Sequence, residues 1–356
     1  APPGDSNLSM PGVAPYSPIC VLREEPEGTL HVARAPDGKL VGLLEPRDDL
    51  PRLSPSTTDT QIFAPRQLVG PSAARRAVVD VEPSVRLGSL LAEGPLPPAF
   101  AARLLLDVLM SLARAHDHGQ RVTVRPDRVL VGVDAQARVV VLGSEDDTML
   151  ASSLRFTAPE ELEHAKDLRG DLWSAGVLFW EALVGKPLFA EHGWGLVTAI
   201  AERPLPRVAD VRPELAPLQP FLDRMLSRDP EARFGSAREA AAAWIDAASE
   251  ADGIASRDAF EVLVTSRAEA AFAAQEAALL EASRVPLATF EREIATAVAK
   301  RPVPRAPDPD LTFTGSISTT TGALGMPSRL DPALVRIALI AFSIAFVLGA
   351  LARAMG

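Results

Sequence analysis

Apolar and polar residues alternate along the first part of the chain in the way that β-strands require. Residues 19–24 and 29–46 are predicted to be strands, and Asp37-Gly38 separates two apolar runs within the second stretch. That dipeptide between apolar runs predicts a β-hairpin. Residues 47–65 contain three prolines and no sustained helical period, so no long helix is expected there. Shorter strand-like pieces resume at residues 67–69 and 77–81.

Helical spacing of apolar residues replaces this alternation from residue 87 onward. A short helix and a turn are expected within 87–98, and residues 99–118 predict a buried helix that ends at Gly119. Residues 171–183 are apolar nearly all round, which is typical of a helix buried on every side. Two intervening strands are predicted at 128–133 and 138–142, and further helices at 196–201, 218–226, 237–248, 259–283 and 287–300.

The two ends of the chain differ from its middle. Residues 1–17 are rich in Pro, Gly and Ser and predict a disordered tail, and residues 301–330 predict a flexible linker. The segment 331–353 contains a twenty-residue apolar stretch, 333–352, whose only charge is Arg336. A helix of that length spans about 30 Å, the thickness of a bilayer core, and Arg336 could reach the headgroups. We therefore predict a transmembrane helix; the alternative is a buried apolar helix of a soluble domain.

Small residues recur on one face of this predicted membrane helix. Ala341, Ala345 and Gly349 are spaced four residues apart, and such a row allows two helices to approach closely. The row is compatible with a homodimer formed through the membrane segment.

Composition and charge narrow the function. The net charge of −10 over 356 residues argues against general nucleic-acid binding. Cys20 is the single cysteine, which excludes an internal disulfide, and no Cys/His cluster has zinc spacing. The first residues have neither a basic start nor an apolar core, so no signal peptide is expected. We expect a cytoplasmic main domain held at the membrane by the C-terminal helix.

Three motifs occur in one order within the helical part. They are Ala158-Pro159-Glu160, the segment DLWSAG that begins at Asp171, and the segment DPEARF that contains Arg233. In this order and spacing, residues 19–247 resemble the bacterial Hanks-type Ser/Thr protein kinase family. The resemblance implies an α+β, kinase-like bilobal fold with a small, reduced β-rich N-lobe and a helical C-lobe. It also implies that Glu160 and Arg233 form a buried ion pair and that Asp171 holds the catalytic loop.

The positions that carry phosphoryl-transfer chemistry in that family are changed in this chain. Only Gly28 remains of the glycine-rich loop, among glutamates, and Leu44 stands at the phosphate-binding lysine. Thr123 occupies the place of the catalytic Asp, Arg128 that of the metal-binding Asn, and Gly143 lies in the D-F-G segment without an Asp. The acidic residues 145–147 could form a shifted metal site, although a solvated acidic loop is the simpler interpretation.

The combined losses predict a pseudokinase, since catalysis of this kind rests almost wholly on electrostatic stabilisation. No cofactor and no metal are expected. The resemblance divides the chain into an N-lobe (18–84), a C-lobe (85–248) and a helical extension (249–300), which packs on its own C-lobe or pairs with a partner helix. The predicted function is a membrane-anchored scaffold or regulator of protein partners in bacterial signalling. The alternatives are a divergent kinase or transferase with a rearranged site, and a structural part of an envelope assembly. Phosphorylation of Ser152, Ser153 or Thr157 by another kinase is a further hypothesis.

Overall fold

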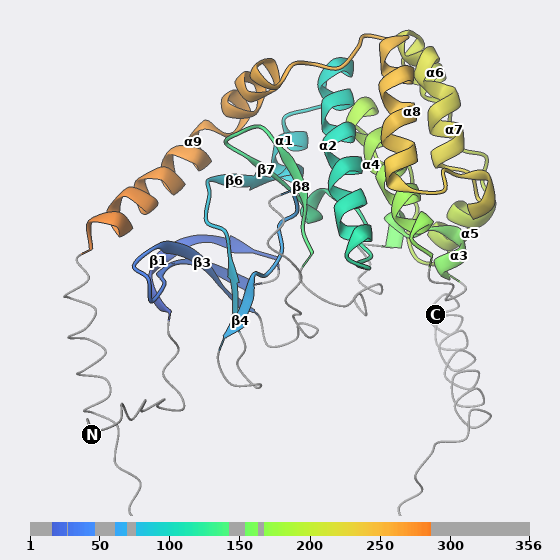
Figure 1. The fold of residues 1–356 in the computed structure, drawn as a ribbon. Coiled ribbons are helices and arrows are strands. Elements are labelled where there is room, and N and C mark those ends of the chain that lie inside the picture. Colours follow the sequence, from blue (N-terminus) through green and yellow to red (C-terminus); the bar gives the residue numbers. More distant parts are fainter. Residues whose placement is uncertain are drawn as a thin grey trace, which may run out of the picture. The chain divides into compact units, whose positions relative to one another are not determined.

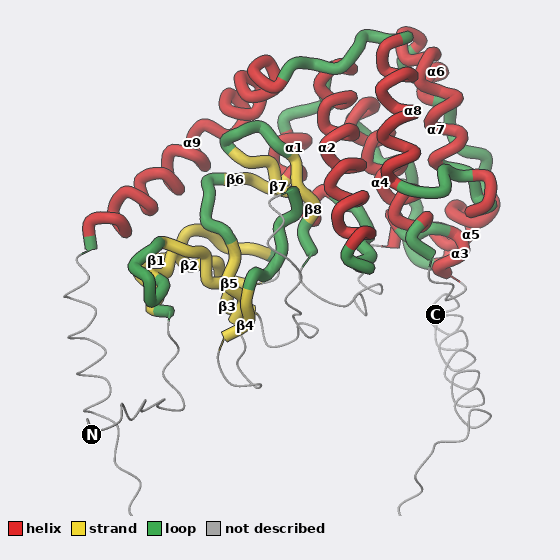
Figure 2. The backbone as a smooth tube through the Cα atoms, in the orientation of Figure 1, coloured by secondary structure: helices red, strands yellow, loops and turns green. Residues whose placement is uncertain are grey.

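The computed structural model describes residues 16–26, 28–46, 61–69, 76–141, 154–162 and 167–285, which belong to one compact unit. They form two lobes, which Figure 2 shows as a group of strands beside a larger group of helices. The bilobal α+β architecture is therefore confirmed. Among the described residues no helix has both the length and the apolar character needed to cross a membrane. Several predicted features fall outside the described residues: residues 1–15 of the predicted tail 1–17, the segment 142–153, the helix 287–300, the linker 301–330, and the membrane helix 331–353 with its small-residue row. The end of the predicted tail is ordered, since Ser17 is the first residue of a β-strand.

The N-lobe is a five-stranded antiparallel sheet in the order β1-β2-β3-β5-β4. The Asp37-Gly38 hairpin joins β2 to β3, with Arg34 opposite Leu40, and Gly38 adopts the positive φ of 86° that favours glycine. The interval 47–60, in which no long helix was expected, lies outside the described residues. The strands are β1 (Ser17–Glu25), β2 (Gly28–Arg34), β3 (Leu40–Pro46), β4 (Gln67–Val69) and β5 (Arg76–Val79).

Each face of this sheet carries a cluster of buried side chains, since successive residues of a strand point to opposite sides. Leu43 faces outward into a small cluster with Ala33, Val69 and Val78. Leu44 faces inward, toward the second lobe. The inner face continues into what we call the interlobe cluster, whose buried members are Leu22, Leu30, Val32, Leu44, Ala77, Val79, Leu130, Val140 and Ala282.

The C-lobe is built around α2 (Pro98–Asp117), α4 (Arg169–Val184) and α8 (Ala237–Ser249). Helix α4 is buried from Gly170 to Leu183, as its apolar circumference predicted. The Trp244 ring of α8 meets the Phe179 ring edge-on, with centroids 4.8 Å apart. The smaller helices are α1 (Leu87–Ala92), α3 (Pro159–Leu162), α5 (Trp194–Glu202), α6 (Val208–Val211) and α7 (Gln219–Met225), with 3-10 turns at Pro126–Arg128, Leu154–Phe156, Pro213–Leu218 and Pro230–Ala232.

A second, three-stranded sheet lies between the lobes. It has the order β6 (Ser84–Arg86), β7 (Val129–Gly132) and β8 (Ala137–Val139). Strands β7 and β8 were predicted from the sequence, with longer bounds, but β6 was not. It pairs with β7 through residues that directly follow the connection from β5, so this edge joins the two lobes.

Helix α9 (Arg257–Arg284) forms the extension and touches both lobes. Figure 1 shows it in orange, running from the helical lobe past β6 to the edge strand β1. Its first half buries Phe260 and Val264 in the C-lobe core, and its far end buries Ala282 in the interlobe cluster. The described part of the extension therefore packs on its own chain, and it packs on the N-lobe as well as the C-lobe.

Candidate functional site

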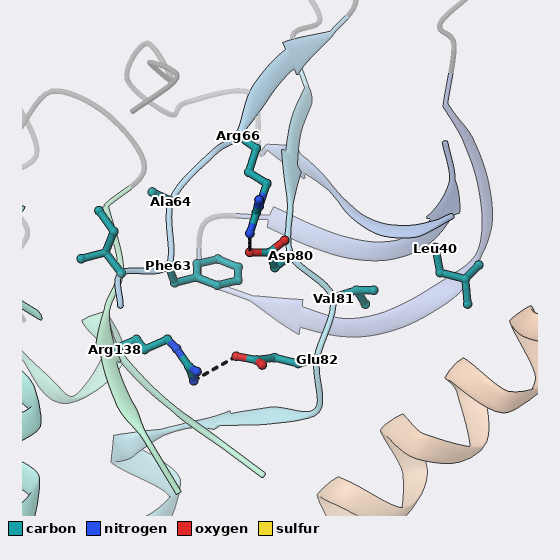
Figure 3. A pocket seen from close by; sticks show the side chains of 9 residues that line it. Leu40, Phe63, Ala64, Arg66, Asp80, Val81, Glu82 and Arg138 are labelled. Atoms are coloured by element: carbon teal, nitrogen blue, oxygen red, sulfur yellow. Dashed lines mark hydrogen bonds and ion pairs between the residues drawn. The ribbon is translucent and has the colours of Figure 1, made fainter. Parts of the chain in front are cut away.

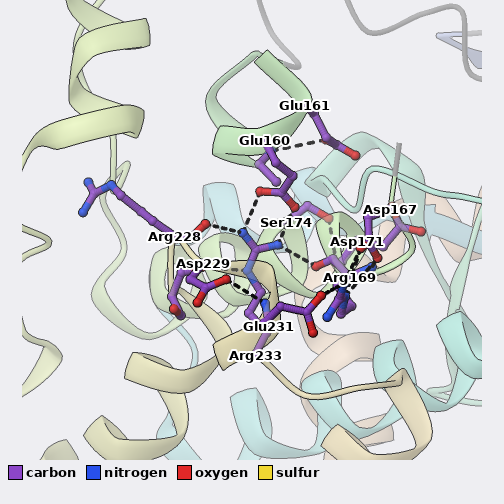
Figure 4. A network of polar contacts seen from close by, with 12 residues as sticks. Glu160, Glu161, Asp167, Arg169, Asp171, Ser174, Arg228, Asp229, Glu231 and Arg233 are labelled. Carbon is purple, nitrogen blue, oxygen red and sulfur yellow. Dashed lines mark hydrogen bonds and ion pairs between the residues drawn. The ribbon is translucent and has the colours of Figure 1, made fainter. Parts of the chain in front are cut away.

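A buried ion pair holds the A-P-E segment to the far side of the C-lobe. Arg233 donates to both carboxylate oxygens of Glu160 at 2.7 Å, and only 2% of Arg233 is exposed. The Arg233 guanidinium also donates to the backbone oxygens of Ser227 and Arg169, at 2.7 and 2.9 Å. Figure 4 shows this arginine at the centre of a polar network that draws on the A-P-E segment, α4 and the loop before α8. The structure thus brings together Glu160 and Arg233, the pair that the resemblance implied.

Asp171, at the start of α4, holds the segment that replaces the catalytic loop. Its Oδ2 accepts the Val122 backbone N–H at 2.8 Å and lies 2.9 Å from His116 Nε2. One turn later, Ser174 Oγ accepts the Val124 N–H at 2.8 Å. The two bonds fix the backbone on either side of Thr123, so the loop keeps its path although its catalytic residue type has changed.

The residues of this loop are cationic where a metal site would need carboxylates. Arg125 is buried and contacts the Asp127 carboxylate at 2.9 Å, and Arg128 ends the 3-10 turn that leads into β7. No group of three or more His, Cys, Asp or Glu side chains in the described part of the chain is arranged to hold a metal ion. Gly143 and the acidic run 145–147 lie outside that part.

The lysine position is filled by a side chain that belongs to an apolar core. Leu44 is 2% exposed and sits in the interlobe cluster with Leu30 and Val32 of the sheet. The same cluster includes Leu130 of β7 and Val140, which directly follows β8, 3% and 0% exposed. Because these residues are buried in one cluster, the apolar surfaces of the two lobes cover each other at this place.

A charged network closes the same region at the end of β1. Glu25 is 4% exposed, and its carboxylate receives Arg23 Nε at 2.5 Å and Arg86 Nε at 2.6 Å. Arg86, on β6, also donates to the Asp127 backbone oxygen. Burial lowers the pKa of Arg23, although the neighbouring Glu25 carboxylate opposes this effect. Glu25 lies within the segment that aligns with the glycine-rich loop, and this network ties it to Arg86 of β6.

Helix α9 adds one polar group to this network. The Gln275 side-chain amide accepts the Ser84 N–H through Oε1 at 3.1 Å and donates to the Ser84 carbonyl through Nε2 at 3.0 Å. Arg23 Nη1 donates to the same Oε1 at 2.8 Å. Gln275 is 5% exposed, and these hydrogen bonds join it to Arg23 of β1 and Ser84 of β6. The backbone N–H and carbonyl of Ser84, which follows the connection between the lobes, are therefore both hydrogen-bonded by the chain's own helix α9.

A separate cavity of about 350 Å³ lies beside the connection that joins β5 to β6. Figure 3 shows Phe63 in it, between an Arg66–Asp80 ion pair and an Arg138–Glu82 ion pair. Arg138 lies 2.9 Å from Glu82. Burial raises the pKa of Glu82, although the positive charge of Arg138 opposes this effect. Both arginines of the wall are paired with carboxylates, so this cavity offers little net positive charge for a phosphate group.

A buried carboxylate of α4 gives a testable pH dependence. Glu181 is 8% exposed, accepts the Leu188 N–H at 3.2 Å, and lies 3.8 Å from Arg155. Burial raises the pKa of Glu181 against the opposing effects of Arg155 and this N–H. At pH values between the unfolded pKa of about 4.3 and the raised folded pKa, the folded chain therefore binds more protons at Glu181 than the unfolded chain does. Folding becomes more favourable as the pH falls through this range.

Relative to Glu181→Gln, the wild-type chain should gain stability as the pH falls from 7 to 5. Urea unfolding of both chains at each pH measures this difference. The glutamine keeps an acceptor for Leu188 and carries no charge, so this variant should be at least as stable as wild type at pH 7. An identical pH dependence in the two chains would contradict the raised pKa.

Comparisons with known proteins were made on the sequence and on the fold. No protein-family model matches the chain. The chain is 28% identical over 155 residues to an Aurora kinase of Schizosaccharomyces pombe, covering 41% of this chain and 43% of that protein. It is 26% identical over 165 residues to the serine/threonine-protein kinase PknB of Mycolicibacterium smegmatis, covering 41% and 26%. It is 30% identical over 181 residues to the serine/threonine-protein kinase pkn2 of Myxococcus xanthus, covering 44% and 21%.

The fold comparison decides the architecture. The kinase domain of Mycobacterium tuberculosis PknI superposes with a TM-score of 0.51 at 21% identity, covering 67% of this chain and 98% of that domain. This chain has a protein-kinase-like fold. The chain spans less than half the length of the curated relatives named above, so the likeness to them concerns one region of each.

Sequence reasoning located some of these residues and missed others. The motif positions led directly to Glu160, Asp171, Arg233, Leu44, Thr123 and Arg128. Glu25, Arg86 and Gln275 were missed, because no motif marks them and their partners lie far away along the chain. The available signal was the spacing of Phe260, Val264, Ala268, Phe272 and Gln275, which marks one face of α9 and places a glutamine on its buried side.

Proposed function

We propose that this chain is a pseudokinase: a kinase-like protein that performs no phosphoryl transfer and works by binding protein partners as a scaffold or regulator. The observation that carries the proposal is the burial of Leu44 inside the interlobe cluster. Phosphoryl transfer requires cations and metal ions around the phosphates. An apolar side chain that contacts both lobes supplies neither.

The surrounding charges support the same interpretation. The buried Glu25 carboxylate is held by Arg23 and Arg86, so these cations already have an anionic partner. Thr123 lies between two backbone positions fixed by Asp171 and Ser174, and it has no carboxylate to accept a proton from a substrate hydroxyl. Glu160, Asp171 and Arg233 hold the C-lobe in its folded form. We propose the surface of this folded lobe for partner binding.

The proposal also includes the predicted membrane helix at 331–353, which would hold both lobes next to a bilayer. Tethering raises the effective concentration of a binding protein near other membrane-bound partners. A scaffold gains from this arrangement without any catalytic step.

Nucleotide binding and phosphate transfer test the proposal. The full chain should show no saturable, magnesium-dependent ATP binding up to about 1 mM, the upper end of ordinary substrate affinities. It should also transfer no labelled phosphate to itself or to a general protein substrate. PknB of Mycolicibacterium smegmatis, assayed in parallel, provides the positive control. Saturable magnesium-dependent binding together with phosphate transfer would favour a divergent kinase and overturn the proposal.

A further inference from the structure

Helix α9 consists of two halves that are held by different contacts. The backbone leaves helical geometry at Ala268, where φ is −129° and ψ is 18°. Residues before this kink pack on the C-lobe, as does Phe272 one turn after it, and residues from Gln275 onward reach β1, β2 and β6. We refer to residues 257–272 as the anchored half and to residues 273–285 as the distal half.

The anchored half has strong and varied contacts. Arg257 forms a two-pronged ion pair with Asp107 of α2, at 2.5 and 2.9 Å. The Phe260 ring lies 6.2 Å from the Phe100 ring, and both Phe260 and Val264 are buried in the C-lobe core. Arg267, beside the kink, donates to the backbone oxygens of Leu90 and Gly94. This half is therefore part of the C-lobe.

The distal half relies on small side chains and a few polar contacts. Past Phe272, its apolar contacts come from Ala278, Leu279 and Ala282, and two of these three residues present only a methyl group. Alanine buries far less apolar area than the phenyl rings that hold the rest of the helix. The binding of this half therefore depends on its polar contacts to an unusual degree.

Those polar contacts recognise general features of a helix. Gln275 satisfies the donor and the acceptor of Ser84 together. Two turns later, Arg34 donates to the carbonyl oxygens of Ala282 and Val285, at 3.1 and 2.9 Å, and so caps the helix end. Any alanine-rich helix with a glutamine about seven residues before the first carbonyl that Arg34 caps could make both contacts, since that spacing is about 10 Å of helix.

We propose that the distal half is a releasable latch, and that the surface beneath it is a docking site for an alanine-rich amphipathic helix of a partner protein that presents a glutamine to Ser84. Arg23, Arg34 and Ser84 form the polar part of this docking surface, and Cys20 and Leu22 lie on the same strand, β1. The alanine-rich character follows from the present occupant, which packs on this surface through Ala278, Leu279 and Ala282. The partner part of this proposal rests on the proposed binding function, whereas the latch does not.

Hydrogen exchange in the full chain tests the latch. In the wild type, the amides of the distal half should exchange at least about tenfold faster than those of the anchored half, because they open separately. Gln275→Ala should accelerate the distal half by about another tenfold, as expected for loss of a buried hydrogen-bond pair, and leave the anchored half unchanged. Glu276→Ala, on the exposed face, is the matched control and should change neither. Equal acceleration of both halves would show that α9 opens as one unit and overturn the latch.

A labelled peptide of residues 273–285 tests the docking surface. The full chain carrying Gln275→Ala and Leu279→Ala should bind it at least about tenfold more tightly than the wild type, whose own helix competes at high effective concentration. A peptide with the same two substitutions should bind more weakly to either chain. Equal peptide affinity of the two chains, or no binding by either, would overturn the docking site. Magnesium-dependent ATP binding by the double variant would instead contradict the proposed non-catalytic function while leaving the latch intact.

Discussion

Replacing Arg233 with methionine should lower the free energy of unfolding by about 3–5 kcal/mol, because a single substitution leaves the buried Glu160 carboxylate without its partner. The loss should be large, since Arg233 is 2% exposed and makes two 2.7 Å bonds to Glu160 as well as bonds to the backbone. Urea denaturation, followed by tryptophan fluorescence, measures it. Glu231→Gln is the control: Glu231 pairs with Arg169 at the surface and its side chain is 78% exposed, so its loss should leave the free energy of unfolding nearly unchanged.

A double variant separates the stranded charge from lost packing. Arg233→Met combined with Glu160→Met removes both charges, and replacing a buried pair by apolar groups is often close to neutral. The double variant should therefore be more stable than Arg233→Met alone, although the backbone bonds of Arg233 remain lost. If the two single losses simply add, the Glu160 carboxylate is not stranded by the loss of Arg233, and the expectation is wrong.

Leu44→Lys, which restores the residue type of the kinase family, should destabilise the chain by about 4 kcal/mol at pH 7. A lysine in this apolar cluster must give up its charge, and burial can lower a lysine pKa by about three to five units. The unfolded chain then binds more protons than the folded chain between the lowered pKa and about 10.4, so the deficit should shrink as the pH rises from 7 to 10. Chemical denaturation at both pH values checks the sign and the size.

Leu44→Met is the matched control for this substitution. It keeps the volume and the apolar character, so it should cost less than about 1.5 kcal/mol. Leu44→Lys should also gain no magnesium-dependent ATP binding, because Leu130 and Val140 still fill the facing surface. A lysine variant as stable as the methionine variant would show that position 44 is open to water, contrary to its 2% exposure.

The sequence predicted the scaffold of this fold because local patterns specify it. The apolar circumference of 171–183 could only suit a central helix, and the structure has α4 there. Asp37-Gly38 specified the β2–β3 hairpin through turn geometry alone. Strand β6 was not predicted, because Ser84–Arg86 is short and is extended only through its pairing with β7. Its signal lies in a partner more than forty residues later, beyond the reach of periodicity.

In the candidate site, likewise, only the residues that local motifs mark could be predicted. Leu44, Thr123 and Arg128 could be located because they occupy recognisable positions in segments that resemble kinase motifs. What surrounds them could not: the sequence gives no register between Gln275 and Ser84, which are 191 residues apart. The sequence predicts that the extension is helical and that it packs on its own C-lobe or pairs with a partner helix. Its packing on the N-lobe sheet is not predicted, since an alanine-rich face fits many surfaces equally well.

The return of α9 to β1 has a consequence for biosynthesis. Cys20 and Ala278 are in contact although 258 residues separate them. A ribosome adding about 5–20 residues per second needs roughly 13–50 s to make the intervening chain. Throughout that time the inner face of the nascent sheet lacks α9, and during the earlier part of it the sheet also lacks β7; both later cover this face. The N-terminal strands should therefore depend on chaperones during translation, and slowing elongation between the two segments should lower the yield of folded chain.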